Sequence, residues 1–409
     1  MNKLLWQSDP ELARCVELEE NRQESYLEMI ASESIQSEES LSLAGGAFNN
    51  KTAVGRPGYQ RLMGSQYADM LETLAAKRAC EVFGADHANM TTYSGSIANY
   101  CAYSACLELG DRVVAMESSA GAHQTHGDKR NKSSKLYDFK YFGLNKETML
   151  IDYEEAERII ALHRPKLVVV GSASYSRNID YEKLGAIAHK NQALLMADIA
   201  HFSGLIAAGL SPNPFPHADI VTASTTKTMC GAHSGFVMCK RELAEAVDRS
   251  IYPENIASLH LQTIAAMAYA LHHSQSEKFK SLMRRVITNA KALCAALEKR
   301  GFGILTGGTD CHMFVADCSA FCSDSEKIAQ AMQKADISVN TKAIPFDCSP
   351  TPRGIRAGTT VLTQRGMGIE EMEYIADLWL TISRAPDEEA VISDVKEKVS
   401  SLMKRFPAK

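Results

Sequence analysis

The sequence contains no long apolar run. Its apolar stretches, such as Leu167 to Val170, are far shorter than the roughly 20 consecutive apolar residues that a transmembrane helix needs. The first fifteen residues, MNKLLWQSDPELARC, include a proline and several charges, so they lack the apolar stretch of a secretory signal. We therefore expect a cytoplasmic protein with no membrane partner.

The chain also lacks paired cysteines. Its eleven cysteines are scattered, with no C-x-x-C pair and no histidine at zinc-finger spacing. An odd, dispersed set of cysteines is typical of reduced and mostly buried thiols in a reducing compartment. We expect neither a disulfide framework nor a bound metal.

An excess of positive charge is missing as well. The 409 residues include 44 Lys and Arg against 49 Asp and Glu, which gives a formal net charge of −5. Nucleic-acid binding usually needs a basic face, and the short basic group at 129–132 is more typical of a solvated loop, so we expect no nucleic-acid partner. Ordinary proportions of 45% hydrophobic and 23% charged residues, with no internal repeat, indicate a globular chain long enough for two domains.

What the sequence does contain is a series of short strand-like runs that alternate with helical stretches. Five of these runs lie at 111–116, 166–171, 193–198, 219–224 and 235–240. They are apolar without a break, which indicates strands buried on both faces of a largely parallel sheet. The predicted fold class is therefore α/β, with a large doubly wound domain.

The two ends of the chain have a different pattern. The first 30 residues predict an amphipathic helical arm, which cannot bury its apolar stripe alone. A long helical region from Leu261 to Arg300 is followed by a strand candidate at 312–317 and by two amphipathic helices, at 369–383 and 387–405. We interpret these later segments as a smaller C-terminal α+β domain. The predicted domains are 1–30 for the arm, 31–278 for the large domain and 279–409 for the small domain.

Two residues at predicted strand ends could carry chemistry. Asp198 ends the strand ALLMAD, and Lys227 follows the next strand, DIVTAS, among hydroxyl residues that include Ser224. Singly, the aspartate is more simply explained as a helix cap and the lysine as a surface residue. Together they match the arrangement of pyridoxal phosphate enzymes, in which the lysine holds the cofactor aldehyde as an imine and the aspartate keeps the pyridine nitrogen protonated.

Two further features fit the same cofactor. Ser94, Gly95 and Ser96 stand where a strand-like run passes into a helix, so the backbone amides at the helix start could hold its phosphate. His123, in the segment AGAHQTHG, could stack on the cofactor ring, although a single buried histidine is more often structural. The predicted cofactor is pyridoxal 5'-phosphate.

These residues lie in segments that resemble the serine hydroxymethyltransferase family nearly from end to end. The most specific segment is MADIAHFSGLIAAGLSPNPFPHADIVTASTTKT at 196–228. Other matching segments are EMIASES at 28–34, YSGSIAN at 93–99, GAHQTHG at 121–127, LTGGTDCHMF at 305–314 and RGIRAGTTVLTQRG at 353–366. The resemblance implies an aminotransferase-like fold (fold type I). It also implies an obligate homodimer with active sites at the interface, in which the arm would bury its apolar stripe on the partner.

The resemblance further implies the roles of individual residues. Lys227 would be the imine lysine, Asp198 would pair with the pyridine nitrogen, and His123 would stack on the ring. His201 would lie near the phenolic oxygen of the cofactor and near the substrate, so that Lys227, His123 and His201 would be the catalytic residues. The phosphate would bind to Ser94, Gly95 and Ser96, and the α-carboxylate of a small amino-acid substrate to Arg356 with help from Ser32.

One segment departs from the family. Members carry Tyr-Ala-Glu-Gly-Tyr-Pro-Gly-Lys-Arg-Tyr-Tyr-Gly-Gly, which enters the neighbouring subunit's site, whereas this chain has TAVGRPGYQRLMG from Thr52 to Gly64. The family glutamate, which handles the proton on the hydroxymethyl group and folate, is replaced by Val54, and valine cannot transfer a proton. Further departures affect cofactor and folate contacts at Gln124, Thr226, His233, 252–259 and 349–352. Dependence on tetrahydrofolate is therefore in doubt.

We interpret the chain as a divergent member of this family that makes or breaks an α-carbon bond of glycine, serine or a related β-hydroxy amino acid, by hydroxymethyltransferase or aldolase chemistry. Two alternatives stay open. One is another pyridoxal phosphate reaction, namely decarboxylation, transamination, or β-elimination and replacement, and the other is a non-catalytic relative. Arg56, Arg61 and His233 could together bind an acidic group of the substrate, although surface ion pairs explain the two arginines equally well.

Overall fold

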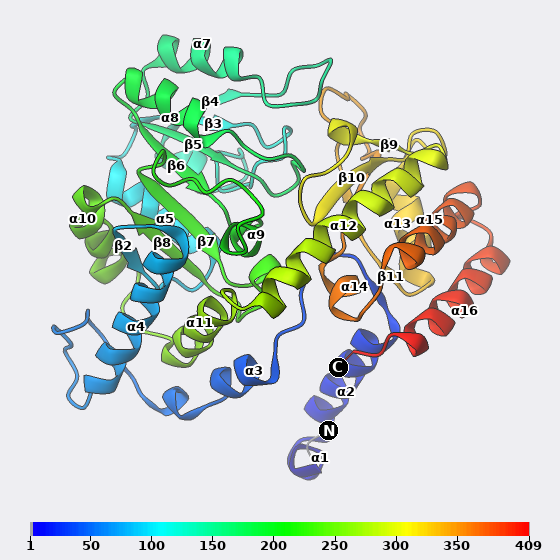
Figure 1. Cartoon of the computed structure of the whole chain (residues 1–409), viewed down its shortest axis with the longest axis horizontal. Coiled ribbons are helices and arrows are strands. Elements are labelled where there is room, and N and C mark those ends of the chain that lie inside the picture. The colour runs from blue at the N-terminus through cyan, green and yellow to red at the C-terminus, as the bar shows by residue number, and fades with distance from the viewer. Residues whose placement is uncertain (1–2, 409) are drawn as a thin grey trace. The chain divides into compact units, whose positions relative to one another are not determined.

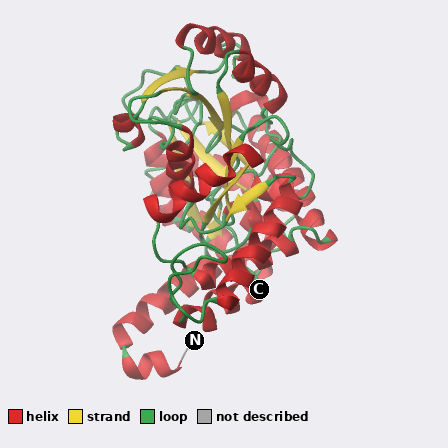
Figure 2. Cartoon of the chain, turned by 90° about the vertical axis from the view of Figure 1, so that its left-hand side faces the viewer, coloured by secondary structure: helices red, strands yellow, loops and turns green. Residues whose placement is uncertain are grey.

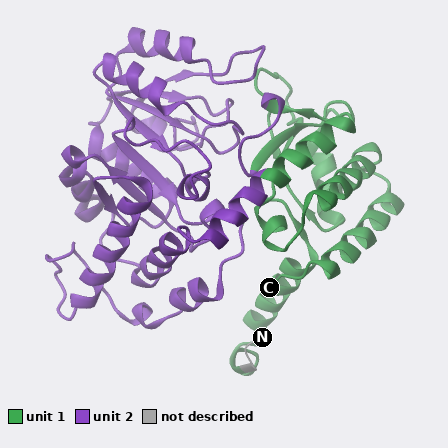
Figure 3. Ribbon diagram, viewed as in Figure 1, with its two compact units in different colours: residues 1–33, 288–305, 313–409 green, residues 34–287, 306–312 purple. Residues whose placement is uncertain are grey.

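The computed structural model describes residues 3–408 and divides into two compact units (Figure 3). Unit 1 comprises the described parts of Met1–Glu33, Thr288–Leu305 and Met313–Lys409, and unit 2 comprises Ser34–Ile287 and Thr306–His312. The domain boundaries that the sequence predicts after residues 30 and 278 stay a prediction.

Unit 2 is built on a seven-stranded sheet (Figure 1). Its strands are β2 (His87–Asn89), β3 (Arg112–Met116), β4 (Asp138–Phe142), β5 (Leu167–Gly171), β6 (Leu194–Asp198), β7 (Ile220–Ser224) and β8 (Gly235–Cys239). They lie in the order β2-β8-β7-β6-β5-β3-β4, and β8 runs antiparallel to both of its neighbours. The five predicted strands are confirmed as β3, β5, β6, β7 and β8, and the mostly parallel α/β architecture is confirmed with them.

The helices of unit 2 precede, connect or follow these strands. They are α3 (Glu38–Ala44), α4 (Gln66–Phe83), α5 (Gly95–Cys106), α6 (Ser133–Leu136), α7 (Tyr153–His163), α8 (Tyr181–Lys190), α9 (Ser203–Ala207), α10 (Ala244–Arg249) and α11 (Leu261–His273), with short turns η1 (Ala47–Asn50), η2 (Lys227–Met229), η3 (Arg241–Leu243) and η4 (Ser250–Asn255). Between residues 3 and 408, no helix is both long and apolar enough to span a membrane.

Both faces of the large sheet are buried because its strands place apolar side chains alternately on either side. Val113 and Leu167 belong to a core cluster with Tyr103 of α5 on one face. Their neighbours Val114 and Val168 point to the opposite face and are 0% exposed. Figure 2 shows helices on both sides of the strands, as a doubly wound sheet requires.

The helical region predicted from Leu261 to Arg300 is two helices rather than one. α11 ends at His273, and α12 (Glu277–Lys299) begins after a short turn. The Ser274 hydroxyl donates to the Leu271 carbonyl, and the Ser276 hydroxyl accepts from the Phe279 N–H. Serine side chains compete with the helix for backbone hydrogen bonds, so they end one helix and start the next here.

Unit 1 contains a four-stranded antiparallel sheet and a separate parallel strand pair. The strands are β12 (Asn340–Lys342), β13 (Gly354–Gly358), β10 (Met313–Asp317) and β9 (Gly303–Ile304), in that order, and β1 (Leu27–Glu28) paired with β11 (Ile337–Ser338). The helices are α1 (Lys3–Ser8), α2 (Pro10–Ser25), α13 (Ser325–Lys334), α14 (Thr360–Gln364), α15 (Ile369–Arg384) and α16 (Glu389–Arg405), with the later part of α12 and the turn η5 (Leu305–Gly307) at the boundary. The predicted strand and the two predicted amphipathic helices are confirmed as β10, α15 and α16, around a core that includes Phe314 and Trp379.

The predicted helical arm is confirmed as α1 and α2. The Asp9 carboxylate caps α2 by accepting a hydrogen bond from the Leu12 N–H at 3.0 Å. Ala13 is buried, whereas Leu12, Val16 and Leu18 are exposed. The arm therefore presents apolar side chains that unit 1 itself leaves uncovered.

Candidate active site

Unit 2 contains a cavity of about 190 Å³ at the carboxyl ends of β6 and β7 and at the start of α5, which we call the Lys227 pocket. Ligands of open parallel sheets bind at this edge. Of the site residues that the sequence predicts, the structure brings these to the pocket: Ser94, Gly95, Ser96, His123, Asp198, Ser224 and Lys227. The other lining residues are Tyr93, Asn99, Ala200, Thr226, His233 and Ser234.

Asp198 is a buried carboxylate in the wall of the pocket. It ends β6 beside Gly171 of β5, where a Cβ would come within 2.6 Å of Asp198, so only glycine leaves room for it. Its Oδ2 accepts from Asn99 Nδ2 at 2.9 Å and from His126 Nε2 at 3.1 Å. Its Oδ1 accepts from the Ala200 N–H at 2.9 Å. The carboxylate is thus fixed by three donors from three parts of the chain.

The surroundings of Asp198 keep it ionised. Burial by itself would raise the pKa of this carboxyl group. The hydrogen bond from His126 and the charges of His126, His123 and Lys227 outweigh burial and hold the pKa well below its usual range. The pocket therefore has a permanent negative charge at a fixed position.

His123 is connected to the same carboxylate through a chain of hydrogen bonds. The Thr222 hydroxyl donates to Asn99 Oδ1 at 2.6 Å, and Asn99 Nδ2 donates to Thr125 Oγ1 at 2.8 Å. Thr125 Oγ1 lies 2.7 Å from His123 Nδ1. These bonds join β7, α5 and the segment after β3, so the imidazole of His123 is oriented by buried side chains.

Lys227 occupies a strained backbone position. Its φ is +45°, a left-handed conformation that costs a residue other than glycine about 1–2 kcal/mol. The flanking loop holds it there, because the Thr225 hydroxyl donates to the Ala232 carbonyl at 2.7 Å and the Thr228 hydroxyl donates to the His201 carbonyl at 2.9 Å. A lysine kept in this conformation by its neighbours is typical of a functional position.

The start of α5 provides a place for an anion. Ser94 is the N-cap, and its hydroxyl accepts from the Ile97 N–H at 3.2 Å. The N–H groups of Gly95 and Ser96 belong to the first turn, where the helix supplies no acceptor and its dipole favours negative charge. Gly235 of β8 packs against this turn so closely that a Cβ there would lie 2.4 Å from Ser94.

Together these groups fit pyridoxal phosphate. An ionised, buried carboxylate suits a protonated pyridine nitrogen, and Asp198 Oδ1 accepts one of the two bonds that a carboxylate oxygen can accept. The helix start suits a phosphate, Lys227 supplies an amine and His123 an aromatic ring. The residues present therefore fit the pyridine nitrogen, the phosphate, the aldehyde and the ring of this cofactor.

His201 is not among the residues that line the pocket. It is buried, and its ring stacks on that of His312 with centroids 5.6 Å apart and an interplanar angle of 18°. Its Nδ1 lies 3.4 Å from His312 Nε2. The backbone of His201 still supports the site, since its carbonyl accepts the hydrogen bond from Thr228.

Arg356 and Ser32 both belong to unit 1. Arg356 lies on β13, and its Nε donates to Asn340 Oδ1 of the neighbouring strand at 2.9 Å. Burial lowers the pKa of this guanidinium. Ser32 is partly buried in the segment after β1.

Arg61 and Arg56 are engaged in contacts away from the lining of the pocket. Arg61 Nε donates to the Tyr252 hydroxyl at 2.6 Å, and Arg56 forms an ion pair with Glu245 at 3.2 Å. His233 is the third residue that the sequence groups with these two arginines. Unlike them, it lines the Lys227 pocket.

The sequence analysis did not identify the residues that form hydrogen bonds with Asp198 and His123. Asn99 and His126 bind Asp198 directly, and Thr125 joins Asn99 to His123. A signal existed for Asn99, because it lies four residues after Gly95 and therefore on the same helix face. No comparable periodicity marks His126, which lies outside any helix or strand.

Comparisons with known proteins point to one family. A model of the serine hydroxymethyltransferase family matches residues 5–379. A serine hydroxymethyltransferase of Acidobacterium capsulatum is 40% identical over 409 residues, which cover 100% of this chain and 96% of that protein. A serine hydroxymethyltransferase of Koribacter versatilis is 40% identical over 410 residues, with 100% of this chain and 96% of that protein covered.

Proposed function

Because the chain belongs to the serine hydroxymethyltransferase family, we propose that its Lys227 pocket makes and breaks the bond between the α- and β-carbons of serine or a related β-hydroxy amino acid, with glycine as the other amino acid. The chain is an enzyme of the glycine and serine hydroxymethyltransferase type that uses pyridoxal phosphate and small amino-acid substrates. The observation that carries the proposal is the placement of Lys227, Asp198 and His123 around one cavity.

The cofactor, when bound, withdraws electrons from the substrate α-carbon and so weakens the bonds to it. Lys227 Nζ would hold the cofactor aldehyde covalently. Asp198 would hold a proton on the pyridine nitrogen, which its low pKa and three hydrogen-bond donors support. The N–H groups of Gly95 and Ser96, with the Ser94 hydroxyl, would bind the phosphate. His123 would cover the ring.

Substrate binding is assigned to Arg356 and Ser32. The guanidinium of Arg356 is oriented by Asn340 through its Nε, and its two terminal nitrogens form the fork that matches a carboxylate. We therefore propose that Arg356 binds the substrate α-carboxylate and that Ser32 assists. His201 would act beside the substrate, and Arg61 would contribute to binding of acidic groups.

The segment from Thr52 to Gly64 leads us to propose that cleavage proceeds without strong help from tetrahydrofolate, although the family uses that cosubstrate. Val54 offers no proton-transfer group, and its backbone is occupied by a bridge to Ser258 and by the Arg61 N–H at 2.8 Å. The β-carbon would then leave as a free aldehyde. The hydroxyl proton would pass to water as the aldehyde forms, and the electrons of the broken carbon–carbon bond would stay with the α-carbon. The α-carbon would then take up a proton to give glycine.

The test is a titration of the full chain, loaded with pyridoxal phosphate, with glycine in the presence and absence of tetrahydrofolate. Visible absorbance reports binding of the amino acid, and trapping of released aldehyde reports cleavage of serine. We expect glycine to change the spectrum and folate to leave the rate of aldehyde release from serine unchanged. A rate that rises strongly with folate would contradict folate independence while leaving the rest of the proposal intact.

The Lys227→Ala variant is the matched control for this titration. It should lose the visible band of the bound cofactor, whereas Lys129→Ala, which changes an exposed lysine outside the pocket, should keep it. If no small amino acid changes the spectrum of the wild-type protein, the proposed chemistry at the α-carbon is wrong.

We also propose that the protein is a homodimer. Each unit exposes apolar side chains that a partner could cover. In unit 1 these are Leu12, Val16 and Leu18 of the arm, and in unit 2 they are Tyr67 and Met70 of α4. Light scattering after gel filtration should give twice the chain mass, and a monomer at micromolar concentration would overturn this assignment.

For the compartment, we propose the cytoplasm. All eleven cysteines are free thiols in the structure, and such thiols persist in a reducing environment. Fractionation of cells that express the protein would test this, since recovery outside the cytoplasm would contradict it.

A further inference from the structure

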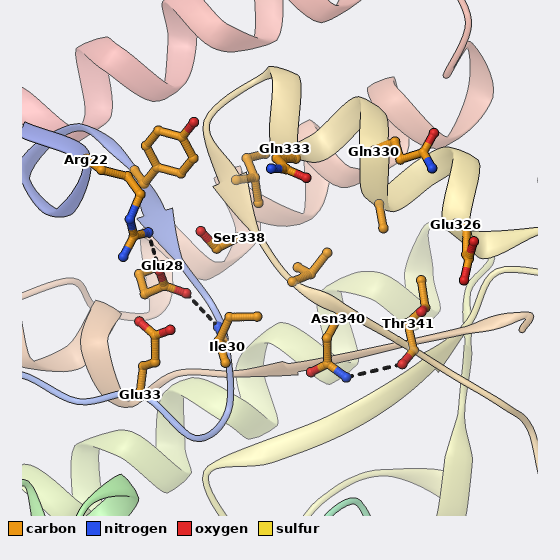
Figure 4. A pocket seen from close by; sticks show the side chains of 14 residues that line it. Arg22, Glu28, Ile30, Glu33, Glu326, Gln330, Gln333, Ser338, Asn340 and Thr341 are labelled. Carbon is orange, nitrogen blue, oxygen red and sulfur yellow. Dashed lines mark hydrogen bonds and ion pairs between the residues drawn. The ribbon is translucent and has the colours of Figure 1, made fainter. Parts of the chain in front are cut away.

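Unit 1 contains a second cavity, of about 500 Å³, that shares no residue with the Lys227 pocket (Figure 4). We call it the Glu33 cavity. It lies between the end of α2, the parallel pair of β1 and β11, the start of β12 and one face of α13. A cavity of this size is large enough for a small organic molecule.

The Glu33 cavity has an excess of negative charge. Glu28, Glu33 and Glu326 line it, and Arg22 is the basic residue among the fourteen described residues of its wall. The charge of Arg22 is already balanced, because its guanidinium donates to both Glu19 oxygens at 2.8 Å and to Glu28 at 2.9 Å. The carboxylates of Glu33 and Glu326 therefore remain without a cation from the cavity wall.

The environment of Glu33 makes it a receptor for positive charge. Desolvation and the nearby carboxyl group of Glu28 raise the pKa of Glu33 to about 7. Glu19 raises this pKa further, whereas the charge of Arg22 lowers it. A bound cation would offset the repulsion between the two carboxylates. The ionised form of Glu33 would then be favoured at neutral pH.

The two carboxylates face the cavity from opposite ends. In Figure 4, Glu33 lies at one end and Glu326 at the other, and the side chains of Gln330, Gln333 and Asn340 lie between them. A metal ion needs several oxygen ligands that converge on one point, so this separation favours an elongated ligand. Amide oxygens along the way can accept hydrogen bonds from ammonium groups.

From this geometry we propose that the Glu33 cavity binds a linear aliphatic diamine. One ammonium group pairs with Glu33, and the other pairs with Glu326. The methylene stem lies against the apolar wall that Ile30 and Val339 provide. This binding needs neither the cofactor nor catalysis, so it can fail or succeed independently of the proposed reaction.

The experiment is isothermal titration calorimetry of the full-length, cofactor-loaded protein with 1,4-diaminobutane at pH 8 and constant ionic strength. Butylamine serves as the matched ligand with one charge. We expect one site per chain. The affinity for the diamine should be about tenfold higher than for butylamine, because butylamine lacks the second ammonium group and so the second charged hydrogen bond. No heat of binding, or equal affinities for the two amines, would overturn the proposal.

Variants locate the site. Glu33→Gln and Glu326→Gln should each weaken diamine binding about tenfold and remove its advantage over butylamine. Glu397→Gln, on the exposed side of α16, should leave binding unchanged. Thermal melts establish whether the variants fold. Glu326 is exposed in the first turn of α13, so we expect Glu326→Gln to fold, and it can test the proposal even if Glu33→Gln is unstable. Unchanged binding in both lining variants would place the diamine elsewhere and refute the assignment.

Discussion

The Lys227 pocket and the segment from Thr52 to Gly64 differ in how far their side chains are buried and hydrogen-bonded. In the pocket, Asp198 is 7% exposed and accepts three hydrogen bonds. In the segment, Tyr59 and Met63 are 83% and 90% exposed. The segment is held by backbone contacts, as at Val54, and by side-chain contacts of Arg56, Gln60 and Arg61.

This difference explains why one region can keep the residues of a family while the other departs from them. A charge that must sit at one point depends on buried partners, and changing any of them leaves another polar group unsatisfied. Exposed side chains such as those of Tyr59 and Met63 can be replaced at little cost to stability. Substitutions in the segment should therefore affect the reaction more than the stability of the fold.

The strongest test of the comparison is to remove the charge of Asp198. Asp198→Asn should lower amino-acid turnover about 100- to 1000-fold, since the charge that faces the cofactor is lost. Asp198→Ala should also destabilise the fold by about 3 kcal/mol, because the N–H groups of Asn99 and His126 lose their buried acceptor. Steady-state kinetics and urea unfolding measure the two effects. The exposed Asp387→Asn should change neither, and a similar loss in that variant would refute a specific role of Asp198.

The second test concerns the one buried carboxyl group that the segment contacts. Gln60 Nε2 donates to Glu72 of α4 at 3.0 Å, and burial with the charge of Asp69 raises the pKa of Glu72 from 4.5 to about 8. The folded state then binds this proton more tightly than the unfolded state. The free energy of unfolding should therefore fall by roughly 5 kcal/mol as the pH rises from about 4.5 through 8.

Two variants isolate this titration in melts recorded between pH 5 and pH 9. Glu72→Gln should reduce the decline because it removes one ionisable group, while Glu33, whose pKa is raised to about 7, still contributes to the decline at lower pH. Gln60→Arg should also reduce the decline, since a cation beside Glu72 lowers the pKa of the carboxyl group. A wild-type stability that does not decline over this range would show that Glu72 titrates normally.

A third test sharpens the contrast by returning a carboxylate to the segment. Val54→Glu should leave the melting temperature nearly unchanged, because Val54 is only partly buried and its backbone contacts remain. It should raise tetrahydrofolate-dependent cleavage of serine about tenfold if position 54 handles the proton. Val54→Gln is the control of equal size without an acid. An equal gain in both variants would rule out proton transfer as the cause.

The smallest expected effect is that of the exposed ion pair between Arg56 and Glu245. Arg56→Ala should change the free energy of unfolding by less than about 1 kcal/mol. Urea unfolding at low and high salt measures this, and the difference should shrink as salt increases. A loss comparable to that of Asp198→Ala would mean that the segment is as tightly integrated as the pocket.

The sequence predicts much of the large sheet because its strands are apolar without interruption. The strand ends then place Asp198 and Lys227 at one edge, and the helix start places Gly95 and Ser96 there. The residues that orient them follow no pattern, since Thr125 and His126 meet Asn99 only through tertiary packing. The break between α11 and α12 was missed for a related reason, because Ser274 and Ser276 act through local hydrogen bonds that hydrophobic periodicity does not register.

The chain of hydrogen bonds that ends at His123 has a single direction. Asp198 only accepts, so Asn99 must present its amide nitrogen to it and its oxygen to the Thr222 hydroxyl. Thr125 Oγ1 accepts a hydrogen bond from Asn99 Nδ2 and lies 2.7 Å from His123 Nδ1. That nitrogen accepts from the Thr125 N–H at 3.3 Å, so the Thr125 hydroxyl can donate to it as well. Since Nδ1 accepts a hydrogen bond, the neutral imidazole carries its hydrogen on Nε2. At that nitrogen His123 is therefore a hydrogen-bond donor.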